Sequence, residues 1–156
     1  MLTVNRAPDL TPFAGTRLGR SEWVTITQPM IDAFAHLTGD THWIHLDADR
    51  AGREMPGGRT IAHGLFLLGL IPGLQRQIYA VTERGAGLNY GYDRIRFSAP
   101  VPVGSRVRLV LILVAAEPHR LGTSIVTEAT MEIEGSDRPA LFARNILLVK
   151  DKPDAR

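Results

Sequence analysis

Residues 65–71 read Leu-Phe-Leu-Leu-Gly-Leu-Ile and belong to a segment of helical length that runs from about residue 63 to residue 80. This part of the segment is apolar on every side of a helix. A helix that is apolar all round is normally buried on all sides, so we expect it to lie at the centre of the core. Pro72 and Gly73 follow the apolar run and should kink or loosen the helix there.

The chain after this helix has the pattern of β-strands. At the odd positions of residues 125–134 stand Ile, Thr, Ala, Met and Ile, whereas the even positions are mostly Glu and Thr. Such alternation indicates one buried and one solvated face, which favours an antiparallel sheet. Turn-forming residues separate four predicted strands. These strands cover residues 89–98, 105–116, 125–134 and 139–149.

Shorter elements are predicted before the apolar helix. Residues 22–27 form a short strand, and residues 28–37 carry apolar side chains at helical spacing. Gly39 is placed to end this helix, as glycine often does. Residues 40–46 are predicted to be a loop. Asp47 is placed to cap a further short helix that runs to about residue 54.

This order of elements predicts an α+β fold in which an antiparallel sheet wraps around one long buried central helix, the hotdog fold. A chain of 156 residues has the size of a single domain. We therefore expect one domain over residues 1–156, with a core from about residue 16 to residue 150. Residues 1–11 and 151–156 are predicted to be loose tails.

Charge and composition exclude several classes of partner. The net charge is only +2, from 18 basic and 16 acidic residues. The sequence contains no run of Lys or Arg that would form the basic patch of a nucleic-acid-binding protein. The apolar stretches are too short and interrupted to span a bilayer. No cysteine is present, so no disulfide or thiol nucleophile is possible. With no signal-peptide pattern at the start, we expect a cytoplasmic protein.

Three groups of residues together resemble a known family. Residues 34–45 read FAHLTGDTHWIH, and residues 61–64 read IAHG. Asn-Tyr-Gly at 89–91, Arg-Phe at 96–97, and the Pro-Val and Gly-Ser pairs within 100–105 follow in order. These motifs resemble the MaoC-like dehydratases and R-specific enoyl-CoA hydratases, from about residue 20 to residue 149. The single-domain subgroup that resembles nodulation protein N, with mycobacterial relatives, is the most similar.

The resemblance implies a hotdog homodimer that acts on an acyl thioester. The expected enzyme is a hydro-lyase of fatty acid metabolism: an R-specific enoyl-CoA hydratase that reversibly converts trans-2-enoyl thioesters into (R)-3-hydroxyacyl thioesters. The acyl carrier is CoA or an acyl-carrier protein. Asp40 and His45 are implied as the catalytic pair, without a metal or organic cofactor. Many members have Asn-Pro where this chain has His42-Trp43, which can alter the wall of the pocket.

The chemistry of hydration fits these residues. Asp40 and His45 are five residues apart on a loop that Gly39 opens, so both side chains can turn onto one water. An ordinary imidazole is neutral and an ordinary carboxylate ionised near neutral pH, as acid–base catalysis requires. Gly64 opens the apolar helix, where free N–H groups favour an anion. We expect its backbone to stabilise the enolate oxygen.

Other interpretations of these residues stay open. Asp40 could cap a turn, and His45 could be an ordinary loop histidine. Together with His42 and His63, the pair could also supply metal ligands, although no H-E-x-x-H spacing supports this. His63, Asn89 and Trp43 are candidates for substrate binding. Each has a structural alternative: His63 at the start of a helix, Asn89 in a turn, and Trp43 in packing.

Two other functions compete with the hydratase. Hotdog thioesterases commonly carry an acidic residue on or beside the central helix, but no acid lies between Gly64 and Ala80. A non-catalytic acyl-thioester-binding subunit would lack one catalytic residue, whereas Asp40 and His45 are both present. The sequence therefore favours water addition over thioester cleavage and over a purely binding role.

Overall fold

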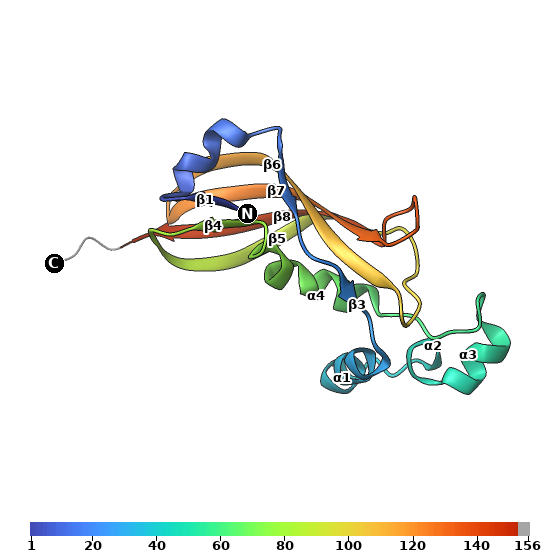
Figure 1. The fold of residues 1–156 in the computed structure, drawn as a ribbon. Coiled ribbons are helices and arrows are strands. Elements are labelled where there is room, and N and C mark those ends of the chain that lie inside the picture. The colour runs from blue at the N-terminus through green and yellow to red at the C-terminus, as the bar shows by residue number, and fades with distance from the viewer. Residues whose placement is uncertain (153–156) are drawn as a thin grey trace.

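The computed structural model describes residues 1–152 and confirms an antiparallel sheet packed around a central helix (Figure 1). In chain order the elements are β1 (Leu2–Val4), the 3-10 helix η1 (Ala7–Phe13), β2 (Arg17–Arg20), β3 (Val24–Thr25), α1 (Gln28–Thr38), α2 (Trp43–Leu46), α3 (Ala48–Glu54), α4 (Gly64–Gln75), β4 (Tyr79–Val81), β5 (Arg84–Phe97), β6 (Arg106–His119), β7 (Gly122–Ile133) and β8 (Leu141–Asp151).

The main sheet has the strand order β2-β6-β7-β8-β5, and β3 also pairs with β6. All of these pairings are antiparallel. The alternation seen in the sequence is confirmed in β7, where Ile125, Ala129 and Met131 are fully buried. These side chains belong to the same hydrophobic core as the buried residues of α4. The alternating pattern therefore marks the face of the sheet that the helix covers.

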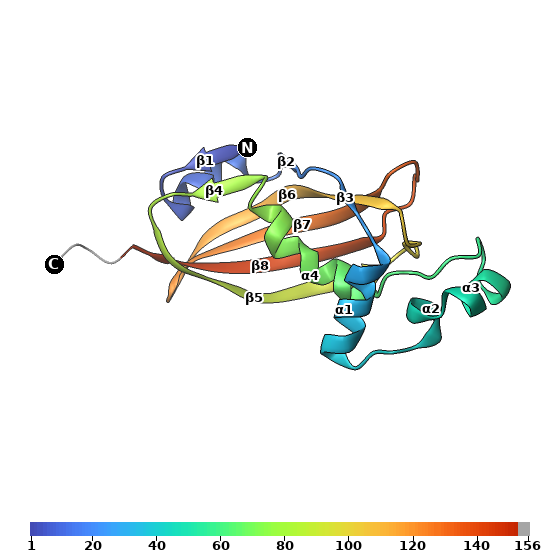
Figure 2. The ribbon, with the colours of Figure 1, turned by 60° about the horizontal axis from the view of Figure 1, so that its bottom comes forward.

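The helix α4 lies across one face of the sheet, as Figure 2 shows. Leu67, Ile71 and Leu74 face the core and are buried. The prediction of burial on all sides is wrong, because Leu65 is 61% exposed and Gly69 is also exposed. The reason is that the sheet covers only one side of the helix, so one apolar stripe faces solvent within residues 1–152.

The helix is also shorter than predicted, since α4 ends at Gln75 instead of near Ala80. Pro72 lies in its last turn and cannot donate a backbone hydrogen bond. Residues 79–81 instead form β4, which pairs in parallel with β1. A long-range pairing with the N-terminus thus takes these residues out of the helix.

The predicted loose N-terminal tail is wrong. Residues 2–4 form β1, and η1 places Leu10 in the core with no exposed surface. The hydroxyl of Thr11 donates to the carbonyl of Ala116 on β6. The N-terminal segment has too few apolar residues to show a helical or strand period in the sequence. Its structure depends on contacts with β4 and β6, which are distant in the chain. At the other end, Asp151 belongs to β8, and residues 153–156 lie outside the described residues.

Smaller corrections concern the strands and the loop before α4. The strand predicted at residues 22–27 is reduced to β3, and β2 precedes it. The predicted loop at 40–46 contains one helical turn, α2, because His42 caps it through the Ile44 N–H. The strand predicted from residue 89 begins earlier, at Arg84. No helix within residues 1–152 is long and apolar enough to cross a membrane.

Candidate active site

The turn at the end of α1 sets the position of Asp40. Gly39 adopts a left-handed conformation with φ of 77°, which costs least for glycine, and its N–H donates to the Ala35 carbonyl at 2.8 Å. The predicted helix end at Gly39 is therefore confirmed. The chain then turns away from α1, and the Asp40 side chain is exposed.

The short helix α2 carries His45 into the interior, where it is only 8% exposed. Its Nδ1 lies 2.7 Å from the Ile61 carbonyl oxygen. Because a carbonyl can only accept, Nδ1 carries the proton and Nε2 keeps a free lone pair in the neutral ring. The amide of Gln28 donates to the backbone carbonyl of His45 at 2.8 Å and fixes the same turn from α1.

The surroundings of His45 favour its neutral form. Burial lowers the pKa of His45 below 6.5, although the hydrogen bond to Ile61 acts in the opposite direction. The positive charge of a protonated His63 would lower this pKa further, whereas the charge of Asp40 raises it. Burial is the largest of these effects, so His45 has a basic Nε2 at neutral pH.

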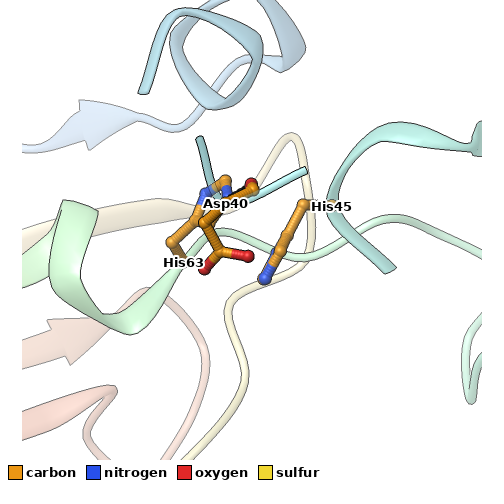
Figure 3. Close-up of side chains that lie close together, drawn as sticks. All are labelled: Asp40, His45 and His63. Carbon is orange, nitrogen blue, oxygen red and sulfur yellow. Dashed lines mark hydrogen bonds between the residues drawn. The ribbon is translucent and has the colours of Figure 1, made fainter. Parts of the chain in front are cut away.

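His63 completes a cluster with Asp40 and His45, shown in Figure 3. One ligating atom from each side chain lies within 4.8 Å of the others. The imidazoles of His45 and His63 stack with centroids 3.7 Å apart and planes 23° apart. The Asp40 carboxylate lies beside the His45 ring (Figure 3). The structure therefore brings these three predicted site residues together.

The cluster has the residue types of a metal site, but the two rings are poorly oriented for one ion. A metal binds the lone pair of an imidazole in the plane of its ring. In two nearly parallel, stacked rings these directions run side by side instead of converging. The arrangement fits a bound water between a carboxylate and a neutral imidazole better.

Gly64 is the first residue of α4, and its neighbour His63 is the N-cap. The first N–H groups of a helix have no partner within the helix, so they are available to an anion. A cavity of about 210 Å³ opens at this helix end, and both His45 and Gly64 line it. A Cβ atom on Gly64 would lie 2.7 Å from the ring of Phe97, so only glycine fits here without a shift.

The two remaining candidates are not among the residues that line this cavity. Trp43 is half-buried on α2, and the guanidinium of Arg50 lies 4.1 Å from its ring centre. Asn89 lies on β5, where its amide donates to the Tyr92 hydroxyl and its oxygen accepts from Asn145. Asn89 lines a second cavity, of about 320 Å³, near the C-terminal end of α4.

Two contacts of the site have no direct signal in the sequence. The Ile61 carbonyl that fixes the His45 ring is a backbone group, and the Asp40 carbonyl that His63 contacts is another. The sequence pattern predicts Gln28 only as the first residue of a helix. Its amide oxygen accepts from Thr60, and its nitrogen donates to His45. Its spacing of three and seven residues from the buried Ile31 and Ala35 is the sequence signal that places this polar side chain on the buried face of α1.

Comparison with known proteins identifies the family. The MaoC like domain matches residues 10–135. The 3-hydroxyacyl-thioester dehydratase Z of Mycobacterium tuberculosis is 47% identical over 148 residues, which covers 94% of this chain and 97% of that protein. Nodulation protein N of Rhizobium leguminosarum is 41% identical and covers 95% of this chain and 93% of its own.

The fold agrees with these similarities. An R-hydratase of Pseudomonas aeruginosa in the unliganded form superimposes with a TM-score of 0.72 at 18% identity, over 98% of this chain and 96% of its own. At that identity the likeness concerns the fold alone. Both the sequence match over most of the chain and the hotdog architecture lead to one conclusion: this chain belongs to the MaoC-like dehydratase family.

Proposed function

We propose that this chain, a hydro-lyase of the MaoC-like family, hydrates trans-2-enoyl thioesters reversibly to (R)-3-hydroxyacyl thioesters. One observation carries the proposal. The Asp40 carboxylate lies close to the ring of His45, whose Nε2 is free, and His45 lines the cavity at the N-terminus of α4. A base, a second proton-carrying group and an anion-stabilising helix end are the three parts that this reaction needs.

In the proposed mechanism, Asp40 and His45 hold one water molecule between them. The His45 Nε2 accepts a proton from the water as its oxygen attacks C3 of the enoyl group. The protonated His45 passes this proton to the neighbouring Asp40 carboxylate, and Asp40, to which we assign the protonation of C2, delivers it there. The water oxygen is then bonded to C3, its two hydrogens are on the new hydroxyl and on C2, and both side chains are back in their starting states. Dehydration follows the same steps in reverse.

The negative charge that develops on the thioester oxygen needs a donor. We assign this role to the backbone N–H of Gly64, because it lies at the free N-terminal end of α4 and lines the cavity with His45. In other enzymes, removal of one such donor costs about 2.7–4 kcal/mol of transition-state stabilisation. Trp43 and Asn89 stay proposed substrate-binding residues, Asn89 through the cavity near the end of α4.

The acyl thioester is proposed from relatives as well as from chemistry. The relative from M. tuberculosis is named for 3-hydroxyacyl thioesters, and a further relative is named a 3-hydroxybutyryl-CoA dehydratase. When water adds to an enoyl thioester, negative charge develops on the thioester oxygen. A backbone N–H that donates to this oxygen stabilises the charge. We therefore propose acyl-CoA, or an acyl-carrier-protein thioester, as the substrate, with no added cofactor.

A homodimer is proposed on physical grounds. β5 is an edge strand of 14 residues, and most of its side chains are exposed. Leu88, Tyr90 and Phe97 on β5 and Leu65 on α4 are large exposed apolar side chains. Long, apolar edge strands normally pair or are covered, because they otherwise promote aggregation. We propose that a second copy of the chain binds at this edge, where it would pair with the free side of β5 and cover the exposed apolar stripe of α4.

The proposed function is tested with crotonyl-CoA. We expect loss of the enoyl absorbance without release of free thiol, and a product of R configuration in a stereospecific dehydrogenase assay. Asp40→Asn should lower kcat by about 10²–10⁴, the usual contribution of one acid–base group, with an unchanged fold. Thiol release from saturated acyl-CoA, or full activity of Asp40→Asn, would contradict the proposal.

A further inference from the structure

We infer that His63 is a positioning residue of this active site: its imidazole holds the Asp40 backbone at one edge and the His45 ring on one face. The inference rests on the proposed function, because it gives His63 a part in the same reaction. It also assigns His63 a task other than substrate contact, since His63 is only 3% exposed.

The first contact is a hydrogen bond to the chain at Asp40. The Nε2 of His63 lies 2.9 Å from the Asp40 carbonyl oxygen. A carbonyl only accepts, so the Nε2 carries the proton, and the ring is held in one tautomer. The other hydrogen bond described for the Asp40 backbone is a long one, 3.4 Å from its N–H to the Thr38 hydroxyl. His63 therefore supplies the shorter of the two restraints on a residue that follows a left-handed glycine.

The second contact is the stack between the rings of His63 and His45. Their centroids are 3.7 Å apart, and their planes differ by 23°. The ring of Phe34 lies 5.0 Å from that of His63 in a tilted arrangement. His45 is thus held at its edge by the Ile61 carbonyl and on its face by His63. Both members of the catalytic pair share this one neighbour.

The remaining nitrogen of His63 argues against a role in packing alone. Its Nδ1 is buried and has no hydrogen-bond partner among residues 1–152. A buried polar atom without a partner costs free energy, and an apolar ring would fill the same space without that cost. The histidine at this position is explained by the donor on its other nitrogen, which an apolar ring lacks.

His63 also acts on the protonation of His45. Burial is the main cause of the lowered pKa of His45, and the Ile61 hydrogen bond opposes it. Three ionisable groups face the His45 ring: His63 and His42 lower its pKa, and Asp40 raises it. Removal of the His63 imidazole should therefore raise the pKa of His45.

The test compares His63→Phe, which keeps a flat ring, with His63→Gln, which keeps a donor near the Nε2 position. We expect His63→Phe to lower kcat for crotonyl-CoA about 10- to 100-fold, because small misplacements of catalytic groups have effects of that size. KM should change less than about threefold, and the melting temperature should not fall. His63→Gln should recover most of kcat. The exposed His36, changed to Phe, is the matched control.

An NMR titration of the His45 imidazole gives a readout that needs no turnover. In His63→Phe its pKa should rise, and the acid limb of the kcat/KM profile should move to higher pH with it. Wild-type kcat in both variants, with an unmoved His45 pKa, overturns the inference. A large fall in the melting temperature of both variants also overturns the inference, because it would show that His63 serves mainly to stabilise the fold. A wild-type protein inactive on enoyl-CoA overturns the proposed function instead, while the titration still tests the contact.

Discussion

Gly64→Ala tests the proposed oxyanion donor at the first residue of α4. An added Cβ would lie 2.7, 2.8 and 2.9 Å from three ring atoms of Phe97, whereas ordinary contact begins at 3.4 Å. The ring or the helix end must therefore shift by about 0.7 Å, the difference between 3.4 and 2.7 Å. Gly64 and Phe97 both line the cavity with His45, so a shift of either one changes the distance from the N–H to a thioester oxygen bound there. Displacement of the N–H should lower kcat about 10²–10³-fold, as loss of one such donor does.

The effect on stability should be much smaller than the effect on kcat. Overpacking costs about 1–3 kcal/mol, and alanine in a helix recovers about 0.5–1 kcal/mol over glycine. A net loss near 1–2 kcal/mol lowers Tm by about 2–8 °C in a chain of this size.

The assay measures kcat and KM for crotonyl-CoA hydration together with Tm. Gly52→Ala is the matched control, because a Cβ at Gly52 in α3 meets nothing within 4 Å. In the double variant with Phe97→Ala the clash is absent, so activity should partly return. A wild-type kcat in Gly64→Ala would refute the assignment of the donor, and so would a loss that Phe97→Ala does not relieve.

Three further predictions concern stability, pH and assembly. Leu10→Ala should lower the free energy of unfolding in urea by about 2–5 kcal/mol, because Leu10 is fully buried; a loss below 1 kcal/mol would contradict an ordered N-terminus. The pKa of His45 is lower in the folded protein than its ordinary value of 6.5, so the neutral imidazole contributes stability that is present above pH 6.5 and is lost as the pH falls through the folded-state pKa. His45→Gln should therefore flatten the pH dependence of the free energy of unfolding in this range, and an unchanged slope would contradict the lowered pKa. Leu88→Lys on the exposed edge β5 should halve the mass in sedimentation, whereas a wild type that already sediments as one chain would exclude the proposed dimer.

Local patterns predicted most of the fold. The alternation in β7, the helical spacing before Gly39 and the apolar run at residues 65–71 each correspond to an observed element. These patterns depend on neighbours in the sequence, and burial on one face imposes them. The pairing of β1 with β4 depends on residues more than 70 positions apart, and no local period records it.

The same distinction holds for the site. Asp40, His45 and Gly64 are residue types with recognisable chemistry in a motif, and the structure brings the first two beside His63 and places Gly64 on the same cavity as His45. Their supports are backbone carbonyls, which any residue can supply, so no residue type indicates them. The exposed stripe of α4 shows a further limit. An apolar pattern indicates what avoids water, but not whether the same chain or another copy covers it.

Residues 61–64 connect all parts of the proposed site. The Ile61 carbonyl accepts from His45, His63 donates to the Asp40 carbonyl, and Gly64 begins α4 and lines the cavity. The segment itself is tied on both sides, since the Ile61 N–H donates to the Ile44 carbonyl and the Ala62 N–H to the Val101 carbonyl. Catalytic groups held in this way need little reorganisation as charge develops, which is the main source of electrostatic catalysis. In the proposed mechanism the base, the second acid–base group and the anion site thus share one support, and we expect a shift of that segment to disturb all three together.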